Sequence, residues 1–251
     1  MELKILYEDN DIIVCVKPPK VPAQSDKTMD YDMVSRVRNY LSEQGKDTYV
    51  AIVHRLDRPV GGVMVFALNK KAAALLSEDI RLRNMKKYYV AAVCPKREIK
   101  NEEQAEGILL EDYLVKNAKD NTSKIVNKGV AGAKLCQLRY QIVDKNLENG
   151  LALVKVELLT GRHHQIRVQM AGCGLPLYGD TKYNSIPKTL GGRKVWQEIA
   201  LFAYCLEFKH PRTKKELEFI SFPDKLSRTP AATAEPMTPA TFGPMACIRR
   251  K

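Results

Sequence analysis

The sequence predicts an α+β fold with a mixed β-sheet. Its 251 residues suit one large domain or two small ones, and they can bury a hydrophobic core without disulfides or metals. Apolar residues make up 45% and charged residues 28% of the chain, which excludes collagen-like and low-complexity classes. Many short strand-like runs are interspersed with a few helical patterns, and the two do not alternate strictly. This order favours α+β over a doubly wound fold.

Short apolar runs bounded by charged or turn-forming residues predict the strands. In chain order they are Leu3–Ile5, Ile12–Val16, Tyr49–Val53, Val63–Leu68, Tyr88–Val93, Gln137–Val143, Leu151–Leu159, Leu201–Phe208 and Glu216–Phe222. The second run ends at Lys17-Pro18-Pro19, because proline cannot continue a central strand. The last two runs flank a charged turn and predict a hairpin, in which we interpret His210 as a turn residue. Residues 95–134 are charged and poorly patterned, and no element is assigned there.

Apolar residues at helical spacing predict three helices. They cover residues 33–41 with Asp30 or Asp32 as N-cap, residues 70–84 with Asn69 as N-cap, and His164–Ala171, which opens after Thr160-Gly161 and closes at Gly172 or Gly174. The last stretch, residues 225–251, holds four Pro, four Thr and five Ala and predicts a disordered basic tail. Residues 1–224 are then the folded domain.

Charge and cysteine usage restrict the location and the partner. No apolar run has the roughly 18 residues of a membrane-spanning helix, and the N-terminus lacks the pattern of a signal peptide. The six cysteines include no Cys-x-x-Cys pair, so we expect reduced thiols and a cytoplasmic location. The net charge is +12; the tail contributes +4 and residues 1–224 carry +8. This balance favours a polyanionic partner, although a merely soluble basic protein has the same charge.

The sharpest local feature is Asp57, which lies between Arg55 and Arg58. Neighbouring guanidinium groups lower the pKa of a carboxyl, so this aspartate is expected to be ionised and suited to act as nucleophile or base. The alternative is an ordinary salt bridge in a loop. Gly61-Gly62 follows shortly, and its lack of side chains would let a ligand approach closely at the mouth of a site.

A second feature is basic and lies at the start of the last predicted helix. Arg162, His163 and Arg167 would form a rim at the helix N-terminus, which suits phosphate. The adjacent His163 and His164 would point about 100° apart on a helix, unlike the i, i+4 pair of a zinc site. No acidic or cysteine ligand lies nearby, so we predict no metal, and a metal-dependent nuclease is the least favoured alternative.

Two adjacent tyrosines follow Lys86-Lys87 in a predicted strand, and Tyr178 and Tyr183 lie near Lys182. A tyrosine in basic surroundings can stack on a nucleobase or act in proton transfer. Because neighbouring strand residues point to opposite faces, at most one of Tyr88 and Tyr89 is expected to face a site.

Taken together, these segments resemble a known family. His54-Arg55-Leu56-Asp57-Arg58 resembles the signature of the RluA-type pseudouridine synthases. The other matching segments, in order, are Leu6–Val14 with Lys17-Pro18, Lys87 with Tyr89 and Ala91, Gly161–Val168 followed by Gly179-Asp180, and His210-Pro211. The resemblance spans residues 3–224. The chain departs from the family pattern at Val60-Gly61-Gly62, where hydroxyl residues are usual, and at His163, where threonine is common.

The resemblance implies a mixed, largely antiparallel sheet with flanking helices and an active site in a central cleft. It implies conversion of uridine to pseudouridine in ribosomal or transfer RNA, or both, without metal or organic cofactor. We expect the protein to be a monomer that binds RNA. We expect neither membrane association nor an obligate protein partner. The matching motifs begin almost at residue 1, so the N-terminal S4 RNA-binding module of many relatives is not expected.

The resemblance also implies roles for individual residues. Asp57 would be the catalytic aspartate, Tyr89 would pack against the uracil and handle the proton at C5, and Arg167 would pair with the Asp57 carboxylate. Arg55 would fill the gap left by the flipped nucleotide. The expected RNA-binding residues are Arg55, Arg58, Arg162 and His163.

The chemistry of the motif separates this reaction from its alternatives. A glycosidase-like hydrolase normally needs two carboxyl groups in opposed protonation states, and the Asp57 motif offers one. A non-catalytic RNA-binding protein on the same scaffold is the main alternative from another class. Such a protein has no need of Asp57, Tyr89 and Arg167 together.

Overall fold

The computed structural model describes residues 3–25, 31–146, 150–184, 189–190, 193–194 and 198–223, so the predicted tail lies outside the described residues. The strands are β1 (Lys4–Glu8), β2 (Ile12–Lys17), β3 (Ala51–Ile52), β4 (Gly61–Ala67), β5 (Lys86–Val93), β6 (Ile108–Asn117), β7 (Thr122–Val126), β8 (Lys134–Asn146), β9 (Leu151–Leu158), β10 (Thr189–Leu190), β11 (Arg193–Lys194), β12 (Leu201–Lys209) and β13 (Glu216–Ile220). The helices are α1 (Met33–Glu43), α2 (Lys70–Arg81), α3 (Glu102–Ala105) and α4 (Gln165–Gly172). Within the described ranges, no helix has the length and apolar character needed to cross a membrane.

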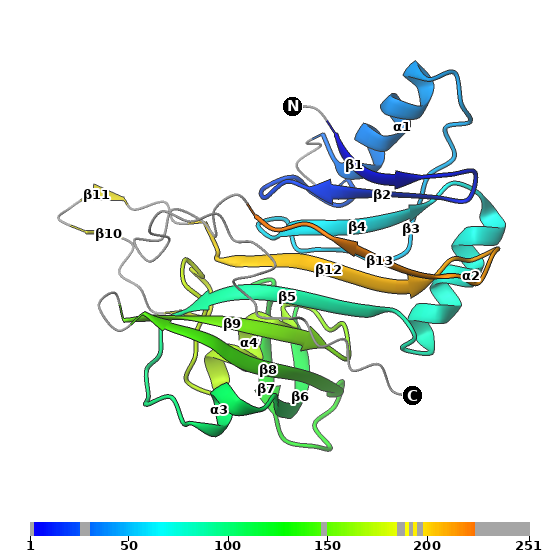
Figure 1. Cartoon of the computed structure of the whole chain (residues 1–251). Coiled ribbons are helices and arrows are strands. Elements are labelled where there is room, and N and C mark those ends of the chain that lie inside the picture. The colour runs from blue at the N-terminus through cyan, green and yellow to red at the C-terminus, as the bar shows by residue number, and fades with distance from the viewer. Residues whose placement is uncertain are drawn as a thin grey trace.

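One sheet runs through the whole molecule in the order β1-β2-β4-β12-β5-β9-β8-β6-β7, with β13 beside β12 and β3 beside β4 (Figure 1). The β4–β12 pair is parallel and the other pairs of this sheet are antiparallel. The mixed, largely antiparallel sheet with flanking helices is therefore confirmed. The predicted hairpin at the end of the chain is also present, as β12 and β13.

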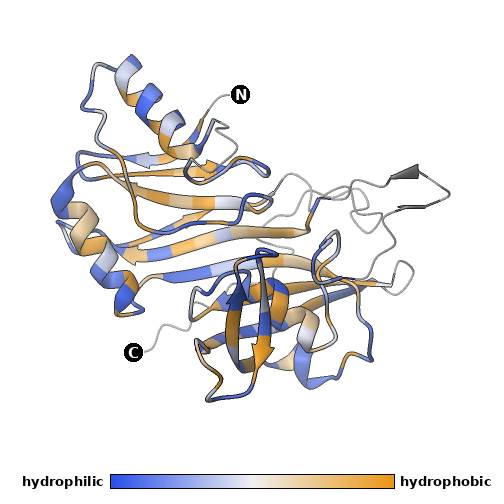
Figure 2. Cartoon of the chain, turned by 180° about the vertical axis from the view of Figure 1, so that it is seen from behind, coloured by the Kyte–Doolittle hydropathy of each residue, from blue (hydrophilic) through white to orange (hydrophobic). Residues whose placement is uncertain are grey.

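Helices α1 and α2 cover opposite faces of the sheet. Met33, Val37 and Leu41 of α1 share a buried cluster with Ile13 and Cys15 of β2. Leu76 of α2 shares another cluster with Ile12 and Val14, the residues on the other face of the same strand. Strand β4 is consequently buried along its full length. The central strands are mainly orange in Figure 2, whereas α1 and α2 alternate between blue and orange.

The predicted helix starts follow from side-chain capping. Asp32 accepts a hydrogen bond from the Ser35 amide, and Asn69 accepts one from the Ala72 amide. Each N-cap satisfies a backbone N–H that has no partner within the helix. Helix α4 differs from prediction: His164 lies outside it, in the left-handed conformation, and the helix begins at Gln165.

Gly61 and Gly62 belong to β4, which corrects their interpretation as the end of a loop at the mouth of a site. Gly62 has φ +136°, and a Cβ there would lie 2.3 Å from the carbonyl oxygen of Ala203. Glycine at this position therefore allows β12 to lie directly against β4. The predicted buried strand Tyr49–Val53 is also corrected: only Ala51–Ile52 forms a strand, and both residues are half-buried.

The poorly patterned stretch 95–134 contains regular structure that the sequence did not predict. It holds α3, β6 and β7, and β6 and β7 form a hairpin on the outside of β8. The hairpin contributes little to the core: Leu114 is its buried apolar residue, packed with Cys136 and Val168 of α4. Its remaining side chains are half-buried or exposed, apart from Ser123.

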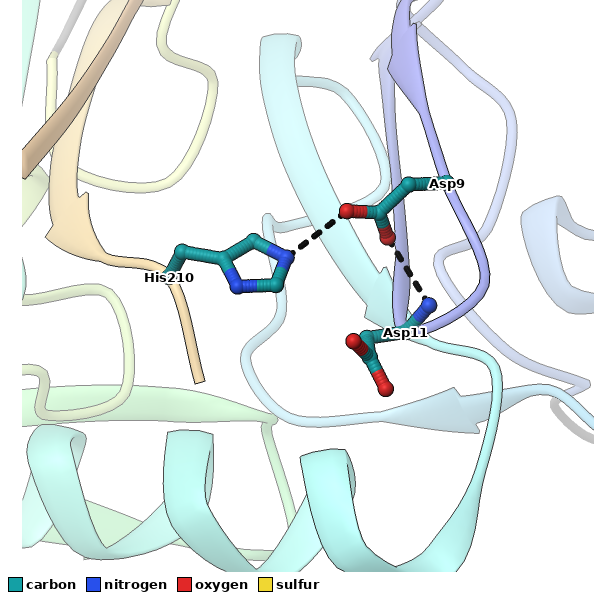
Figure 3. A group of neighbouring side chains, drawn as sticks. All are labelled: Asp9, Asp11 and His210. Carbon is teal, nitrogen blue, oxygen red and sulfur yellow. Dashed lines mark hydrogen bonds and ion pairs between the residues drawn. The ribbon is translucent and has the colours of Figure 1, made fainter. Parts of the chain in front are cut away.

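A buried histidine ties the two ends of the described chain together. His210 Nε2 lies 2.7 Å from Asp9 (Figure 3). His210 Nδ1 accepts hydrogen bonds from the backbone amides of Arg212 and Thr213. Asp11 pairs with Arg212 at 2.6 Å. His210 is therefore a turn residue, as predicted, and it also joins the β1–β2 turn to the turn after β12. Asp9, Asp11 and His210 lie close enough together to hold a metal ion, but in this structure their side chains bond to one another and to Arg212.

Candidate active site

A cleft of about 1170 Å³ is lined by residues between β3 and β4, by the end of α2, by β5, and by the segment from the end of β9 to the start of α4. Asp57 and Tyr89 both line this cleft. Asp57 is the only carboxylate among the described residues of the lining. The cations that line it are Arg55, Arg58, Arg81, Arg83, Lys87, Lys116, Arg162 and Arg167. The cleft therefore presents one carboxylate in strongly cationic surroundings.

A tight turn, held by a buried lysine, carries Asp57. The Val60 amide donates to the Asp57 carbonyl at 2.9 Å and closes the turn. The fully buried Lys17 donates from Nζ to the carbonyl oxygens of Arg58, Val21 and Pro18 at 3.1, 2.6 and 3.1 Å. Since the three carbonyls come from two loops, Lys17 fixes the Asp57 turn to the end of β2. Burial lowers the pKa of Lys17 to about 7, and the negative charge of Asp57 opposes that shift.

The charge environment of Asp57 differs from the sequence-based prediction. Burial raises the pKa of Asp57, and Arg167 and Lys17 partly oppose this shift. The flanking Arg55 and Arg58 are exposed, and Arg58 Nε donates to the carbonyl of Lys20. The expectation that these two arginines lower the pKa is therefore wrong: the pKa is raised, and the cations that act most strongly on Asp57, Arg167 and Lys17, come from other elements.

Arg167 is buried in the structure, which corrects its placement on an exposed basic rim. Its Nε and one terminal nitrogen donate to the two carboxylate oxygens of Asp180 at 2.8 and 2.7 Å. Its other terminal nitrogen lies 3.8 Å from Asp57 Oδ2. Arg167 thus lies between two carboxylates. It forms a bidentate salt bridge with Asp180 and a longer ion pair with Asp57. Asp180 also accepts from the Lys182 amide, which fixes the turn that presents it.

Both His163 and His164 line the cleft, and His164 lies beside Asp57. Their rings stack with centroids 3.8 Å apart. His164 Nε2 lies 3.7 Å from Asp57 Oδ2, and His164 Nδ1 lies 2.9 Å from the Tyr183 hydroxyl oxygen. His163 is half-buried and bonds to Ser123 and Asn121 of the β6–β7 hairpin. Neither histidine belongs to a group of possible metal donors within the described residues.

Tyr89 is buried in β5 and faces the cleft, whereas Tyr88 packs on the other face with Tyr204. The prediction that at most one of the pair faces a site is therefore confirmed. Burial, and then the negative charge of Asp57, raises the pKa of Tyr89. Its hydroxyl stays protonated at physiological pH.

The structure brings Asp57, Tyr89 and Arg167 into one cleft, together with the four residues expected to contact RNA. Arg162 is exposed at the rim, and its Nε donates to the Leu135 carbonyl. The sequence alone indicates no role in the site for Lys17, His164 or Asp180, and it indicates Tyr183 only as a tyrosine in basic surroundings. The signal available for Asp180 is its place in the Gly179-Asp180 segment, which matches the family pattern.

The fold and the site define an α+β protein with a cationic cleft around one carboxylate. The family model for RNA pseudouridylate synthase matches residues 11–172. An uncharacterized RNA pseudouridine synthase of Helicobacter pylori is 30% identical over 226 residues, covering 87% of this chain and 66% of the relative. Ribosomal large subunit pseudouridine synthase C of Haemophilus influenzae is 27% identical over 224 residues, covering 87% and 65%.

This chain belongs to the RNA pseudouridylate synthase family, and the resemblance to its RluA-type members is confirmed. The chain spans about 66% of the length of the first of these relatives. The solved structure of human RNA pseudouridylate synthase domain containing 4 has the same fold, with a TM-score of 0.69 and 22% identity over 87% of this chain and 88% of that one.

Proposed function

We propose that this chain isomerises uridine to pseudouridine in ribosomal or transfer RNA, with Asp57 as the catalytic carboxylate. The observation that carries the proposal is the lining of the cleft, in which Asp57 is the single described carboxylate among many cations. The cations suit a polyanion, because they neutralise phosphates as the RNA enters. Family membership of residues 11–172 gives the reaction class.

The reaction breaks the N-glycosidic bond, turns the freed uracil and rejoins the sugar to C5. The atoms balance within the nucleotide, and the hydrogen on C5 leaves as a proton while a proton is placed on N1. An ionised carboxylate can start this either by attacking C1′ of the sugar or by removing a sugar proton, and both routes need Asp57 deprotonated. Arg167 and Lys17 favour that ionised form.

The other residues have roles that follow from their places in the cleft. A uridine in folded RNA must first leave its stack, which costs a few kcal/mol. Arg55 is exposed in the loop before Asp57, where it can fill the vacated position. Because its phenol stays protonated, Tyr89 suits packing against the uracil better than accepting the C5 proton. Arg58, Arg162 and His163 would contact the backbone around the flipped nucleotide.

The presence of a single carboxylate in the described lining of the cleft also favours isomerisation over hydrolysis. A hydrolase would require a second carboxyl group to protonate or to activate water. Asp180 is the next acidic group near the site, but its side chain is fully buried and both oxygens bond to Arg167. It therefore serves as a partner of Arg167 and is not available as an acid.

The test is primer-extension mapping of carbodiimide adducts on pseudouridine, after unmodified ribosomal and transfer RNA have been incubated with the protein. We expect new stops with the wild type and none with Asp57→Ala, while a gel shift shows RNA binding by both. Asp144→Ala is the control, since Asp144 is exposed on β8 and outside the cleft. Modification by Asp57→Ala would overturn the role of Asp57. Binding without stops for the wild type would instead favour a non-catalytic RNA-binding protein.

A further inference from the structure

The hydrogen bonds of Tyr183 have a fixed direction. The backbone N–H of Ser123 lies 2.7 Å from the Tyr183 hydroxyl oxygen, and an amide N–H can only donate. The second partner of this hydroxyl among the described residues is His164 Nδ1, at 2.9 Å. If Nδ1 carried a proton, the half-buried hydroxyl would receive two donors and leave its own proton without an acceptor. The hydroxyl therefore donates to Nδ1.

This direction determines the tautomer of His164. Nδ1 accepts, so the proton of the neutral imidazole lies on Nε2. The ring is neutral because burial lowers the pKa of His164 to about 2, with further lowering by Arg167, His163, Lys182 and Lys116. The Nε2–H is thus a neutral donor, and its nearest acidic neighbour is Asp57, with Oδ2 at 3.7 Å.

The backbone at His164 is as unusual as its surroundings. The residue has φ +54°, a left-handed conformation that residues other than glycine seldom adopt. Its side chain accepts no capping hydrogen bond from the backbone amides at the start of α4. Residues held in such conformations concentrate at functional sites, where the surrounding structure maintains them. Here the maintained feature is an imidazole inserted between Tyr183 and Asp57.

We propose that Tyr183 fixes the Nε2–H tautomer of His164, and that His164 positions the Asp57 carboxylate by donating from Nε2 to Oδ2. The proposal rests on the function proposed above. Arg167 approaches the same oxygen, at 3.8 Å, while its two other bonds hold Asp180. Both distances to Oδ2 exceed a hydrogen bond, and we expect them to shorten when RNA binds, as catalytic contacts commonly do in substrate complexes. His164 is a positioning residue, because it acts through Asp57.

The tautomer can be measured without any assay of activity. The chain has four histidines, so ¹⁵N-histidine labelling and long-range proton–nitrogen correlation can be assigned with one His164→Asn spectrum. We expect His164 to carry its proton on Nε2 in the wild type and to lose this fixed state in Tyr183→Phe. A wild-type His164 protonated on Nδ1 would overturn the proposal.

Two substitutions at position 164 distinguish the loss of the Nε2–H donor from a disturbance of the local backbone. Asparagine adopts the left-handed conformation more readily than most residues, but its side chain is too short to bring an N–H to Oδ2. The amide of glutamine reaches the position of Nε2. We expect His164→Asn to lower the single-turnover rate about 10- to 100-fold, the effect of losing a hydrogen bond to a charged group, with RNA affinity unchanged. His164→Gln should recover most of that loss.

The ionisation of Asp57 gives a readout that a purely structural role would not move. Losing the Nε2–H removes a donor to the ionised form, so the ¹³C titration of the Asp57 carboxyl should shift to higher pH in His164→Asn. An unchanged Asp57 titration together with an unchanged rate would overturn the proposal. If the wild type forms no pseudouridine, the proposed function fails on its own, and the tautomer and the titration still decide whether His164 positions Asp57.

Discussion

Replacing Asp180 by asparagine removes one charge from the Arg167–Asp180 pair and keeps the shape of the side chain. The side chains of Asp180 and Arg167 are 0% and 6% exposed. Removing one partner of a buried pair costs about 3–5 kcal/mol, because the remaining charge is left uncompensated. Asp57, 3.8 Å from Arg167, compensates part of the loss. We therefore expect a loss near the lower limit, about 3 kcal/mol, which lowers Tm by about 6–12 °C for a folded unit of this size.

Urea denaturation followed by far-UV circular dichroism measures the free energy of unfolding of both forms. The matched control is Glu157→Gln, which breaks a pair with Arg139 at 3.0 Å whose side chains are 25% and 47% exposed. An exposed pair contributes about 1 kcal/mol or less, so this control should change little. If Asp180→Asn loses no more stability than Glu157→Gln, then Asp180 does not compensate the buried charge of Arg167.

Two further outcomes follow from the structure. Burial raises the pKa of Asp57, and the proposed reaction needs its ionised form. Single-turnover rates should therefore fall as the pH drops through that raised pKa. A fall in rate only at the pKa of an exposed aspartate would contradict the effect of burial. Gly62→Ala should destabilise the protein by about 3 kcal/mol, since its Cβ would lie 2.3 Å from the Ala203 oxygen at φ +136°. Gly45→Ala, at φ +65° with open space around it, should cost only about 1 kcal/mol, measured by the same urea denaturation. Equal losses would refute the close approach of β4 and β12.

The sequence predicts the elements whose signals are local. Capping by Asp32 and Asn69 depends on residues three positions apart, and the buried strands consist of continuous apolar runs. The β6–β7 hairpin was missed because it buries little apolar surface, so its strands lack a clear alternation. The role of Gly62 was also missed, because the strand that approaches it, β12, lies some 140 residues later in the chain.

The same distinction holds for the candidate site. Asp57 and Tyr89 were found because each lies within a short, chemically distinctive segment. The partners that set the charge of Asp57 could not be read from spacing, since Lys17 and Arg167 reach it from distant elements. The sequence pattern predicts His164 as the first residue of a helix, whereas in the structure it precedes the helix in a left-handed conformation and its ring lies beside Asp57.

The central position of β12 has a consequence for synthesis of the protein. Strand β5 lines the cleft and β4 directly follows the loop that carries Asp57; both are made early, but β12 lies between them and follows β5 by roughly 110 residues. At ribosomal speeds that interval lasts roughly 5–20 s, during which the facing edges of β4 and β5 lack their partner. Unpaired strand edges attract other chains, so the nascent protein should need chaperone protection in this interval. The cleft is complete only after β12, which ends at Lys209, has been made and has inserted between β4 and β5, so a growing chain that lacks β12 also lacks the complete cleft for RNA.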